Sequence, residues 1–240
     1  MTNSNCPLCG GTGWISQDRD GYSAAERCEC MTRPKNMNEK QADAQIPRKY
    51  ASASFDIGAP DNPTLRNAIF LVKNYADHFT PDAKKLGLLL VGPTGTGKTH
   101  LAIAALRHLL ARGFEGTFFD YQNLLERIYA GYSEKTGASD REAYRAALDS
   151  EILLLDDLGA HRINDWVEDT VTSIITYRYN NNKPLIATTN LADPDLGGLD
   201  NKARLTLEDR IGPRARSRLF EMCTVVSTWG AADYRLKMRR

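Results

Sequence analysis

A glycine-rich run of eight residues constrains the fold of this chain more than any other part of its sequence. Gly92-Pro93-Thr94-Gly95-Thr96-Gly97-Lys98-Thr99 follows an apolar run at 86–91 and opens a segment, 99–112, whose apolar residues recur at helical spacing. Glycines let such a loop curve tightly, so that its backbone N–H groups and the positive end of the helix dipole face phosphate oxygens. The spacing is the Walker A pattern, and its strand–loop–helix context predicts a P-loop that binds ATP. A glycine-rich turn that binds nothing is the alternative.

Two side chains of this loop are expected to act on phosphate and metal. Lys98 is expected to neutralise charge between the β- and γ-phosphates, and the Thr99 hydroxyl is expected to bind Mg²⁺. An apolar run that ends in acids, Leu153-Leu154-Leu155-Asp156-Asp157, supplies the second half of such a site. We expect Asp156 to hold the Mg²⁺ shell.

Two further polar residues are candidates for orienting the attacking water. Asp157 stands where many ATPases of the additional-strand class carry a glutamate that polarises water, and its shorter side chain favours slow hydrolysis or a switch-like cycle. Asn190 closes the apolar run 184–189 and is placed to orient water against the γ-phosphate. Exposed acids and an ordinary turn residue are the alternative interpretations.

The segments around the loop predict an α/β fold. Short apolar runs typical of buried strands alternate with segments of helical period. The predicted strands cover 86–91, 116–120, 151–156, 184–189 and 222–228, and the predicted helices cover 99–112, 121–131, 140–149 and 166–180. Because continuous apolar strands that alternate with helices form sheets covered on both faces, we expect a parallel five-stranded sheet between helices.

Length and composition allow one substantial core and a small appendage. The chain has 240 residues, of which 42% are hydrophobic, and its net charge of +1 neither favours nor excludes a nucleic-acid partner. We predict a zinc-binding module at 1–31, a linker at 32–46 and an ATPase domain at 47–240. No apolar stretch approaches the roughly 20 residues of a membrane span. The start of the chain shows no signal-peptide pattern, so we expect a cytoplasmic protein with no membrane contact.

Four cysteines near the start of the chain predict a metal site. Cys6 and Cys9 have the Cys-x-x-Cys spacing, and Cys28 and Cys30, a tighter pair than usual, complete a tetrahedral set of four thiolates. In a reducing cytosol, clustered thiols are more often metal ligands than disulfides. Four thiolates leave no position for water, so we expect a structural Zn²⁺; free or incidentally paired thiols are the alternative. A turn signature at 18–22 predicts a hairpin between the two pairs.

Several motifs occur in an order that resembles one family. They are the strand–Walker A–helix unit, the run Leu154-Leu155-Asp156-Asp157-Leu158-Gly159, the run Ala187-Thr188-Thr189-Asn190, and the arginine-rich segment 209–223. In this order they resemble the AAA+ ATPases that load replicative helicases, of the DnaC and DnaI type, and the related transposition ATPase IstB. The resemblance covers about Tyr50 to Arg235. It implies a five-stranded AAA+ core in which the strand that ends at Asn190 lies between the Walker A and Walker B strands.

The resemblance also assigns roles to arginines of the basic C-terminal third. In AAA+ assemblies an arginine of one subunit completes the ATP site of its neighbour. The motif for this trans-acting arginine maps best onto Arg218. An extra run at 212–216 departs from the shorter family pattern, so Arg214 is the second choice and Arg216 stays open. Arg235 resembles the sensor-2 arginine, which touches phosphate in its own subunit. A solvated basic helix face and a charged tail are the alternative.

Motifs and resemblance together predict a helicase loader. We expect an ATPase that uses ATP and Mg²⁺, forms an ATP-dependent homo-oligomer, contacts single-stranded DNA and docks a hexameric replicative helicase through its zinc module. Phe55 is, by resemblance, an adenine contact or a plain core aromatic. Tyr129, Tyr132 and Lys135 are candidates for holding single-stranded DNA, with functionless surface aromatics as the commoner explanation.

Two other functions stay open. One is an IstB-like transposition helper ATPase that binds duplex DNA, and the other is a nucleotide-gated adaptor that scarcely hydrolyses ATP. The zinc module favours the loader, because the transposition relatives generally carry a helical N-terminal domain instead.

Overall fold

The chain divides into two units, which are described separately. The computed structural model describes residues 6–19, 22–31, 35–57, 60, 62–83, 85–130, 139–195 and 205–231. The first unit is Met1–Glu39 and the second is Lys40–Arg240. Lys40 Nζ donates a hydrogen bond to the carbonyl oxygen of Leu110 (2.8 Å), and the N–H of Phe118 donates to the carbonyl oxygen of Ala44 (2.8 Å). Residues 40–46, predicted as part of the linker, therefore lie within the second unit.

An antiparallel hairpin and a cysteine cluster make up most of the first unit. β1 (Trp14–Arg19) pairs with β2 (Tyr22–Arg27), as the turn signature predicts, and a short 3-10 turn (Glu29–Met31) follows. Every residue of β2 is exposed. The buried cluster of this unit consists of cysteines, with Ile15 packed against it. Thiol groups therefore occupy the place where a larger domain would have an apolar core.

Five parallel strands form the sheet of the second unit, in the order β4–β5–β6–β3–β7. The strands are β3 (Gly87–Val91), β4 (Gly116–Asp120), β5 (Ile152–Asp156), β6 (Leu185–Thr189) and β7 (Cys223–Ser227). Each begins and ends within one residue of its predicted bounds. β6 lies between β3, which precedes the glycine loop, and β5, which ends in Asp156. This is the strand order that the resemblance implies.

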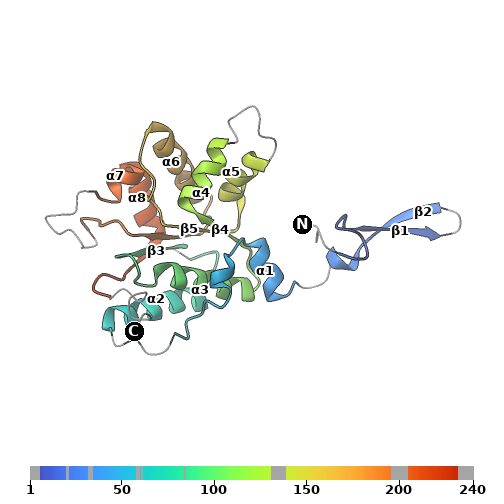
Figure 1. The fold of residues 1–240 in the computed structure, drawn as a ribbon, viewed down its shortest axis with the longest axis horizontal. Helices are drawn as coiled ribbons and strands as arrows, with labels where there is room; N and C mark the ends of the chain where they lie inside the picture. Colours follow the sequence, from blue (N-terminus) through green and yellow to red (C-terminus); the bar gives the residue numbers. More distant parts are fainter. Residues whose placement is uncertain are drawn as a thin grey trace. The chain divides into compact units, whose positions relative to one another are not determined.

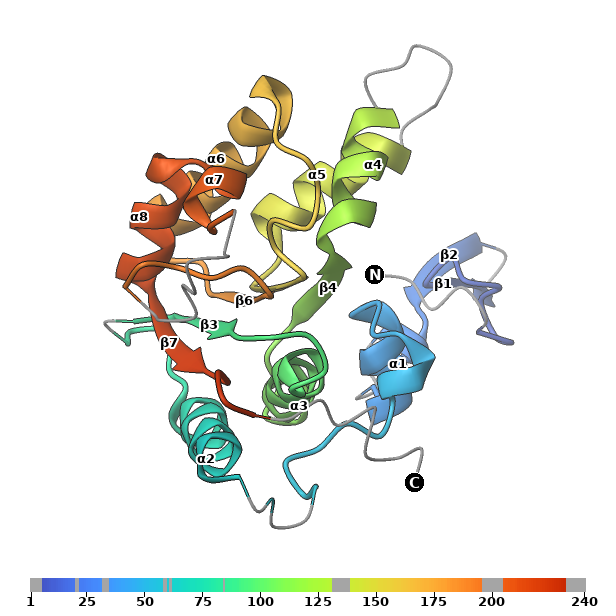
Figure 2. The same ribbon diagram turned by 60° about the vertical axis from the view of Figure 1, so that its left-hand side comes forward.

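Helices cover both faces of this sheet (Figures 1 and 2). On one face lie α2 (Pro63–His78) and α3 (Lys98–Ala111). On the other lie α4 (Tyr121–Ala130), α5 (Ser139–Asp149), α6 (Asp165–Asn180), α7 (Glu208–Ile211) and α8 (Pro213–Met222). α1 (Met37–Asp43) precedes all of them. The helices predicted from the sequence do not include α2, α7 or α8. Within the described ranges, no helix is both long enough and apolar enough to cross a membrane.

A buried arginine on α6 joins that helix to three other elements of the second unit. Arg178, on α6, has no exposed surface (0%). Its guanidinium donates to main-chain carbonyl oxygens at the end of α5 and just before β5 and β6, those of Ala147, Leu148, Ser150, Glu151 and Pro184. Burial lowers the pKa of Arg178 to about 9, so the side chain keeps its charge near neutral pH. The carbonyl oxygens take the place of the water that the charge loses on burial.

We expect Arg178→Met to lower the free energy of unfolding by about 2–4 kcal/mol, because the carbonyl groups lose their donor where water does not reach. Urea denaturation followed by circular dichroism measures the change. Arg145→Met, at an exposed position on α5, is the matched control and should change stability by no more than about 0.5 kcal/mol. Equal stability of the two variants would contradict the structural role of Arg178.

Candidate functional site

The glycine loop between β3 and α3 has the geometry of a phosphate cradle. Gly95 (φ 82°) and Gly97 (φ 90°) adopt left-handed conformations, which glycine enters without strain. A Cβ atom at Gly92 would lie 2.2 Å from Thr228 Oγ1, so the close approach requires glycine. α3 begins at Lys98 without a side-chain N-cap. The N–H groups of its first turn are therefore available to an anion such as phosphate.

Thr228, just after β7, braces this loop from a distant part of the sequence. Its hydroxyl lies 2.7 Å from that of Thr96, and both side chains are buried. The N–H of Thr228 donates to the carbonyl oxygen of Val91 (2.7 Å). Within the loop, Lys98 is 4% exposed and its Nζ donates to the carbonyl oxygen of Pro93 (2.7 Å). No local motif marks Thr228, so it is not among the predicted site residues.

Asp156, at the end of β5, meets the start of α3. Its Oδ1 accepts hydrogen bonds from Thr99 Oγ1 (2.9 Å) and Thr188 Oγ1 (2.6 Å). Burial raises the pKa of the Asp156 carboxyl, and the two hydroxyl donors oppose this rise. A bound cation would favour the charged carboxylate further. Because a carboxylate beside a hydroxyl offers the oxygen ligands that Mg²⁺ prefers, Asp156 and Thr99 fit the metal of a bound nucleotide.

Asp157 and Asn190, predicted to orient water, lie in contact. Asp157 has a φ of 57°, a left-handed conformation that aspartate tolerates, and its N–H donates to Thr188 Oγ1 (3.0 Å). Asn190 Nδ2 donates to Asp157 Oδ1 (2.8 Å). The parallel strands β5 and β6 end side by side, which brings together two residues that are 33 positions apart.

A cavity of about 400 Å³ lies against the glycine loop. Residues 94–99, Asp157 and Asn190 form part of its lining, and the rest comes from Tyr50, Ile57, Leu65, His100 and Leu101. A site that combines backbone N–H groups with apolar side chains suits a nucleotide, whose base is apolar and whose phosphates are charged. The predicted site residues do not include Tyr50, Ile57 or Leu65, because no motif marks them. Phe55, the candidate adenine contact, does not line this cavity; its ring packs beside His108 (6.0 Å between centroids).

The three candidate trans-acting arginines all lie on α8, but their surroundings differ. Arg216 donates to both carboxylate oxygens of Asp193, from Nε (2.7 Å) and Nη2 (2.5 Å), and Nη2 also donates to Asp195 (2.6 Å). Arg214 and Arg218 form no hydrogen bond or ion pair with another residue in the described part of the chain. Arg216 is therefore committed to its own chain, whereas Arg214 and Arg218 have charge to offer a ligand.

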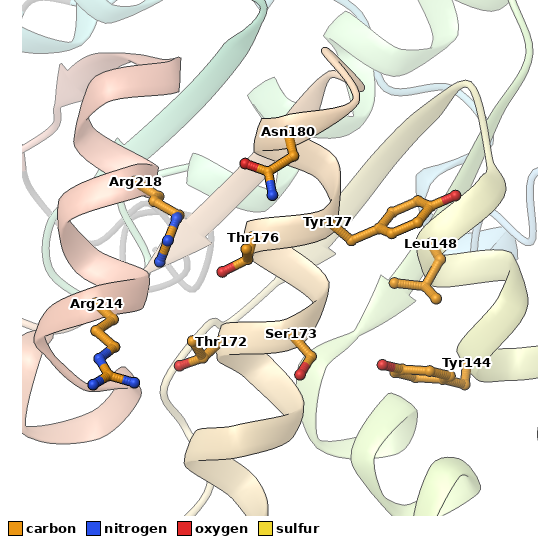
Figure 3. A pocket seen from close by; sticks show the side chains of 9 residues that line it. All are labelled: Tyr144, Leu148, Thr172, Ser173, Thr176, Tyr177, Asn180, Arg214 and Arg218. Atoms are coloured by element: carbon orange, nitrogen blue, oxygen red, sulfur yellow. The ribbon is translucent and has the colours of Figure 1, made fainter.

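Arg214 and Arg218 line an open groove of about 600 Å³ that extends from α8 across α6 to Tyr144 and Leu148 of α5. Figure 3 shows both side chains pointing from α8 toward Thr172, Thr176 and Asn180 of α6. The groove and the nucleotide cavity share no lining residue. Neither arginine therefore contributes to the nucleotide cavity of its own chain.

Three other predicted site residues, Arg235, Tyr132 and Lys135, lie outside the described residues. Tyr129, on α4, is 68% exposed, and its ring contacts Trp166 edge-on (5.4 Å between centroids).

The four predicted cysteine ligands lie together in the first unit. All their Sγ atoms are within 4.8 Å of one another, with Cys6 and Cys28 at 3.7 Å and Cys9 and Cys30 at 3.5 Å. Thiolates bound to Zn²⁺ at ~2.3 Å in a tetrahedron lie ~3.8 Å apart, whereas a disulfide requires ~2.05 Å. The distances therefore fit a metal site and not disulfides.

Backbone donors favour the thiolate form of Cys9, one of the four cysteines of this cluster. The N–H of Gly13 donates to Cys9 Sγ (3.3 Å). Burial works against ionisation of Cys9, but the N–H groups of Gly13 and Gly11 and the Cys30 thiol together lower its pKa to about 6. Burial and the neighbouring thiols raise the pKa of Cys30. Metal binding requires thiolates, so Cys9 is the readier of the two to bind Zn²⁺.

Known proteins resemble this chain over two thirds or more of its length. The profile of the family described as IstB-like ATP binding protein matches residues 61–240. The uncharacterized protein YqaM of Bacillus subtilis is 26% identical, over 87% of this chain and 63% of its own length. The putative ATP-binding protein Rv3427c in an insertion sequence of Mycobacterium tuberculosis is 29% identical, over 67% of this chain and 64% of its own length. The chain thus spans less than two thirds of both relatives.

A crystal structure of the DnaC helicase loader shares the fold. It is 34% identical, with a TM-score of 0.65, and the match covers 75% of this chain and 99% of that one. The predicted α/β fold, a P-loop AAA+ core with a five-stranded parallel sheet, is confirmed by this likeness and by the observed strand order.

We expect the purified full-length chain to contain one Zn²⁺, and Cys28→Ser/Cys30→Ser to lose it, because two thiolates cannot close a tetrahedral site. Metal analysis measures the zinc, and fluorescent-nucleotide binding checks that the second unit still binds ATP. Cys223→Ser is the control, since Cys223 is buried on β7 outside the cluster, and it should retain its zinc. Equal zinc in the wild type and the double variant would refute the site.

Proposed function

Because this chain belongs to the IstB-like ATP-binding protein family, we propose that it is an ATPase that loads a hexameric replicative helicase onto single-stranded DNA. The observation that carries the proposal is its likeness to the DnaC helicase loader, which extends over almost all of that chain. The second unit binds and hydrolyses ATP and assembles into an ATP-dependent homo-oligomer. The first unit docks the helicase.

The residues around the nucleotide cavity share the work of hydrolysis. The loop N–H groups and Lys98 hold the phosphates, and Thr99 and Asp156 hold Mg²⁺, which supplies positive charge beside the phosphate oxygens. Asp157 polarises the attacking water, and Asn190 holds the Asp157 carboxylate through the 2.8 Å hydrogen bond. Because Asp157 is shorter than glutamate and already bonded to Asn190, hydrolysis is slow in the isolated chain.

Arg218 acts at the ATP site of a neighbouring subunit. Its place in an open groove, away from its own nucleotide cavity, supports this role. A guanidinium that no described carboxylate neutralises is suited to the γ-phosphate of ATP bound by another chain. Arg235 contacts phosphate within its own subunit.

The first unit is suited to protein contact. Leu8, Trp14 and Tyr22 are 64%, 52% and 81% exposed in a unit of fewer than forty residues. Exposed large apolar side chains in such a density are typical of contact surfaces. In the second unit, the exposed ring of Tyr129 is of the kind that stacks on the bases of single-stranded DNA.

The second candidate function is that of a transposition helper ATPase that binds duplex DNA. The likeness to the ATP-binding protein of an insertion sequence favours it. The two functions share the ATP site and differ in their partners, so binding partners discriminate between them.

We expect Lys98→Ala and Arg218→Ala to be inactive as ATPases when assayed alone and to regain part of the rate when mixed. Lys98→Ala fails to hold ATP but still offers Arg218, whereas Arg218→Ala binds ATP normally. A mixed assembly therefore pairs one intact P-loop with one intact arginine. Removal of such an arginine from an efficient site typically lowers the rate by about 10³-fold, and we expect a smaller loss here because Asp157 already makes the wild type slow. If the ATPase rate recovers when Lys98→Ala is mixed with Arg214→Ala but not with Arg218→Ala, then Arg214 is the trans-acting arginine. No recovery in either mixture would contradict trans action.

We expect the full chain to co-elute with a hexameric replicative helicase, and to place it on single-stranded DNA, in the presence of ATP. Size-exclusion chromatography and a strand-unwinding assay measure the two steps. Lys98→Ala should lose the ATP dependence, and Cys28→Ser/Cys30→Ser should lose the helicase while keeping ATP binding. ATP-dependent binding to duplex DNA without helicase binding would favour the transposition helper.

A further inference from the structure

One side of α8 is fixed by a buried ion pair. The Arg216 guanidinium makes two parallel hydrogen bonds to Asp193, whose side chain has no exposed surface (0%), while that of Arg216 is 17% exposed. Burial works to raise the pKa of Asp193, but the bonds from Arg216 and from the N–H of Asp195 hold it below its usual range. A two-bond contact fixes the plane of the guanidinium as well as its distance, so it orients the helix that carries it.

The side chain of Arg216 points to a different side of α8 from the side chains of Arg214 and Arg218. Residues four apart share a helix face, whereas a residue two positions away points roughly 200° around the axis. Arg214 and Arg218 accordingly face the groove toward α6 (Figure 3), and Arg216 faces the segment that follows β6. The ion pair holds α8 from one side while the other side presents Arg218.

The segment that holds Arg216 continues directly from the nucleotide site. Asn190 lines the cavity, and Asp193 comes three residues later in the chain. Between them Ala192 is buried, and its carbonyl oxygen accepts a hydrogen bond from the N–H of Leu207 (2.9 Å), just before α7. The N–H of Asp195 closes a turn on Asp193 Oδ1 (3.0 Å). Asp193 therefore lies in a short, internally bonded segment between Asn190 and α8.

Arg216 is unsuited to the trans-acting role itself. Besides Asp193, it lies against Asp195 (2.6 Å) and Glu208 (3.7 Å). Three carboxylates around one guanidinium leave no net positive charge for a phosphate on another chain.

We propose that Arg216 is a positioning residue for the trans-acting arginine. Its pair with Asp193 holds α8 so that Arg218 projects from the groove toward a neighbouring subunit, and it links that position to the segment carrying Asn190. The inference rests on the proposed trans action of Arg218. A chain of bonded residues then connects the ATP site of a subunit to α8, which carries the arginine that acts on the neighbouring subunit.

The complementation group of Arg216→Gln tests the proposal. We expect its ATPase rate to fall by about 100-fold, since a displacement of about 1 Å at a reacting group has this effect. Its own ATP affinity should match the wild type, because Arg216 does not line the nucleotide cavity. Mixed with Lys98→Ala, it should regain activity, because its own P-loop is intact. When it is mixed with Arg218→Ala, the ATPase activity should not recover, because neither variant then has a correctly placed Arg218 side chain.

Further variants separate positioning from a loss of folding. Asp193→Asn/Arg216→Gln removes both charges, so no buried carboxylate stays unpaired, and it should fall into the same complementation group. Arg216→Lys keeps one ion pair and should recover part of the rate. Lys73→Gln, at an exposed position on α2, is the control and should match the wild type.

The mixtures also distinguish the inference from the function it rests on. Recovery of Arg216→Gln with Arg218→Ala but not with Lys98→Ala would place its defect in its own ATP site and overturn the proposal. Wild-type rates in both Arg216→Gln and the double variant would overturn it too. If Lys98→Ala and Arg218→Ala fail to complement each other, the trans action of Arg218 is wrong and the inference falls with it.

Discussion

The carboxylate of Asp156 is the contact on which the candidate ATP site depends. It accepts hydrogen bonds from the hydroxyl of Thr99 on α3 and from that of Thr188 on β6, so one side chain of β5 joins a helix to two neighbouring strands of the sheet. Thr188 in turn accepts the N–H of Asp157, whose carboxylate binds Asn190. Strands β3, β6 and β5 are adjacent in the sheet, and loops after the carboxyl ends of parallel strands are where open α/β sheets bind ligands. A single buried acid thus sets the positions of the polar groups around the phosphates.

Local patterns predict the parts of this molecule that local chemistry determines. The strands are predictable because burial on both faces requires continuous apolar runs. The glycine loop is predictable because its spacing encodes left-handed turns at Gly95 and Gly97, and both are present. The four cysteines are predictable because a metal demands particular donor atoms whatever the surrounding fold. α2 is not among the predicted helices, although its buried residues, Ala68, Val72 and Ala76, recur at helical spacing.

The rest of the site depends on contacts between distant segments, which no local pattern records. Tyr50, Ile57 and Leu65 reach the nucleotide cavity only because the chain before β3 folds back over the glycine loop. The arginines of α8 look alike in the sequence, and their division into one buried ion pair and two groove residues follows from which helix face meets Asp193. Long-range pairing of this kind sets roles that residue type alone leaves open.

The contact between Thr228 and the glycine loop makes ATP binding depend on a segment that is synthesised late. A ribosome completes the Walker A loop when well under half of the chain has been made, yet the strand and the hydroxyl that secure this loop arrive with β7 and Thr228. β3 also waits for β6, its other neighbour in the sheet. Because domains fold as units during synthesis, a nascent or prematurely ended chain has the phosphate-binding motif without the support that shapes it. Nucleotide binding therefore requires a nearly complete second unit, although the first unit is made long before it.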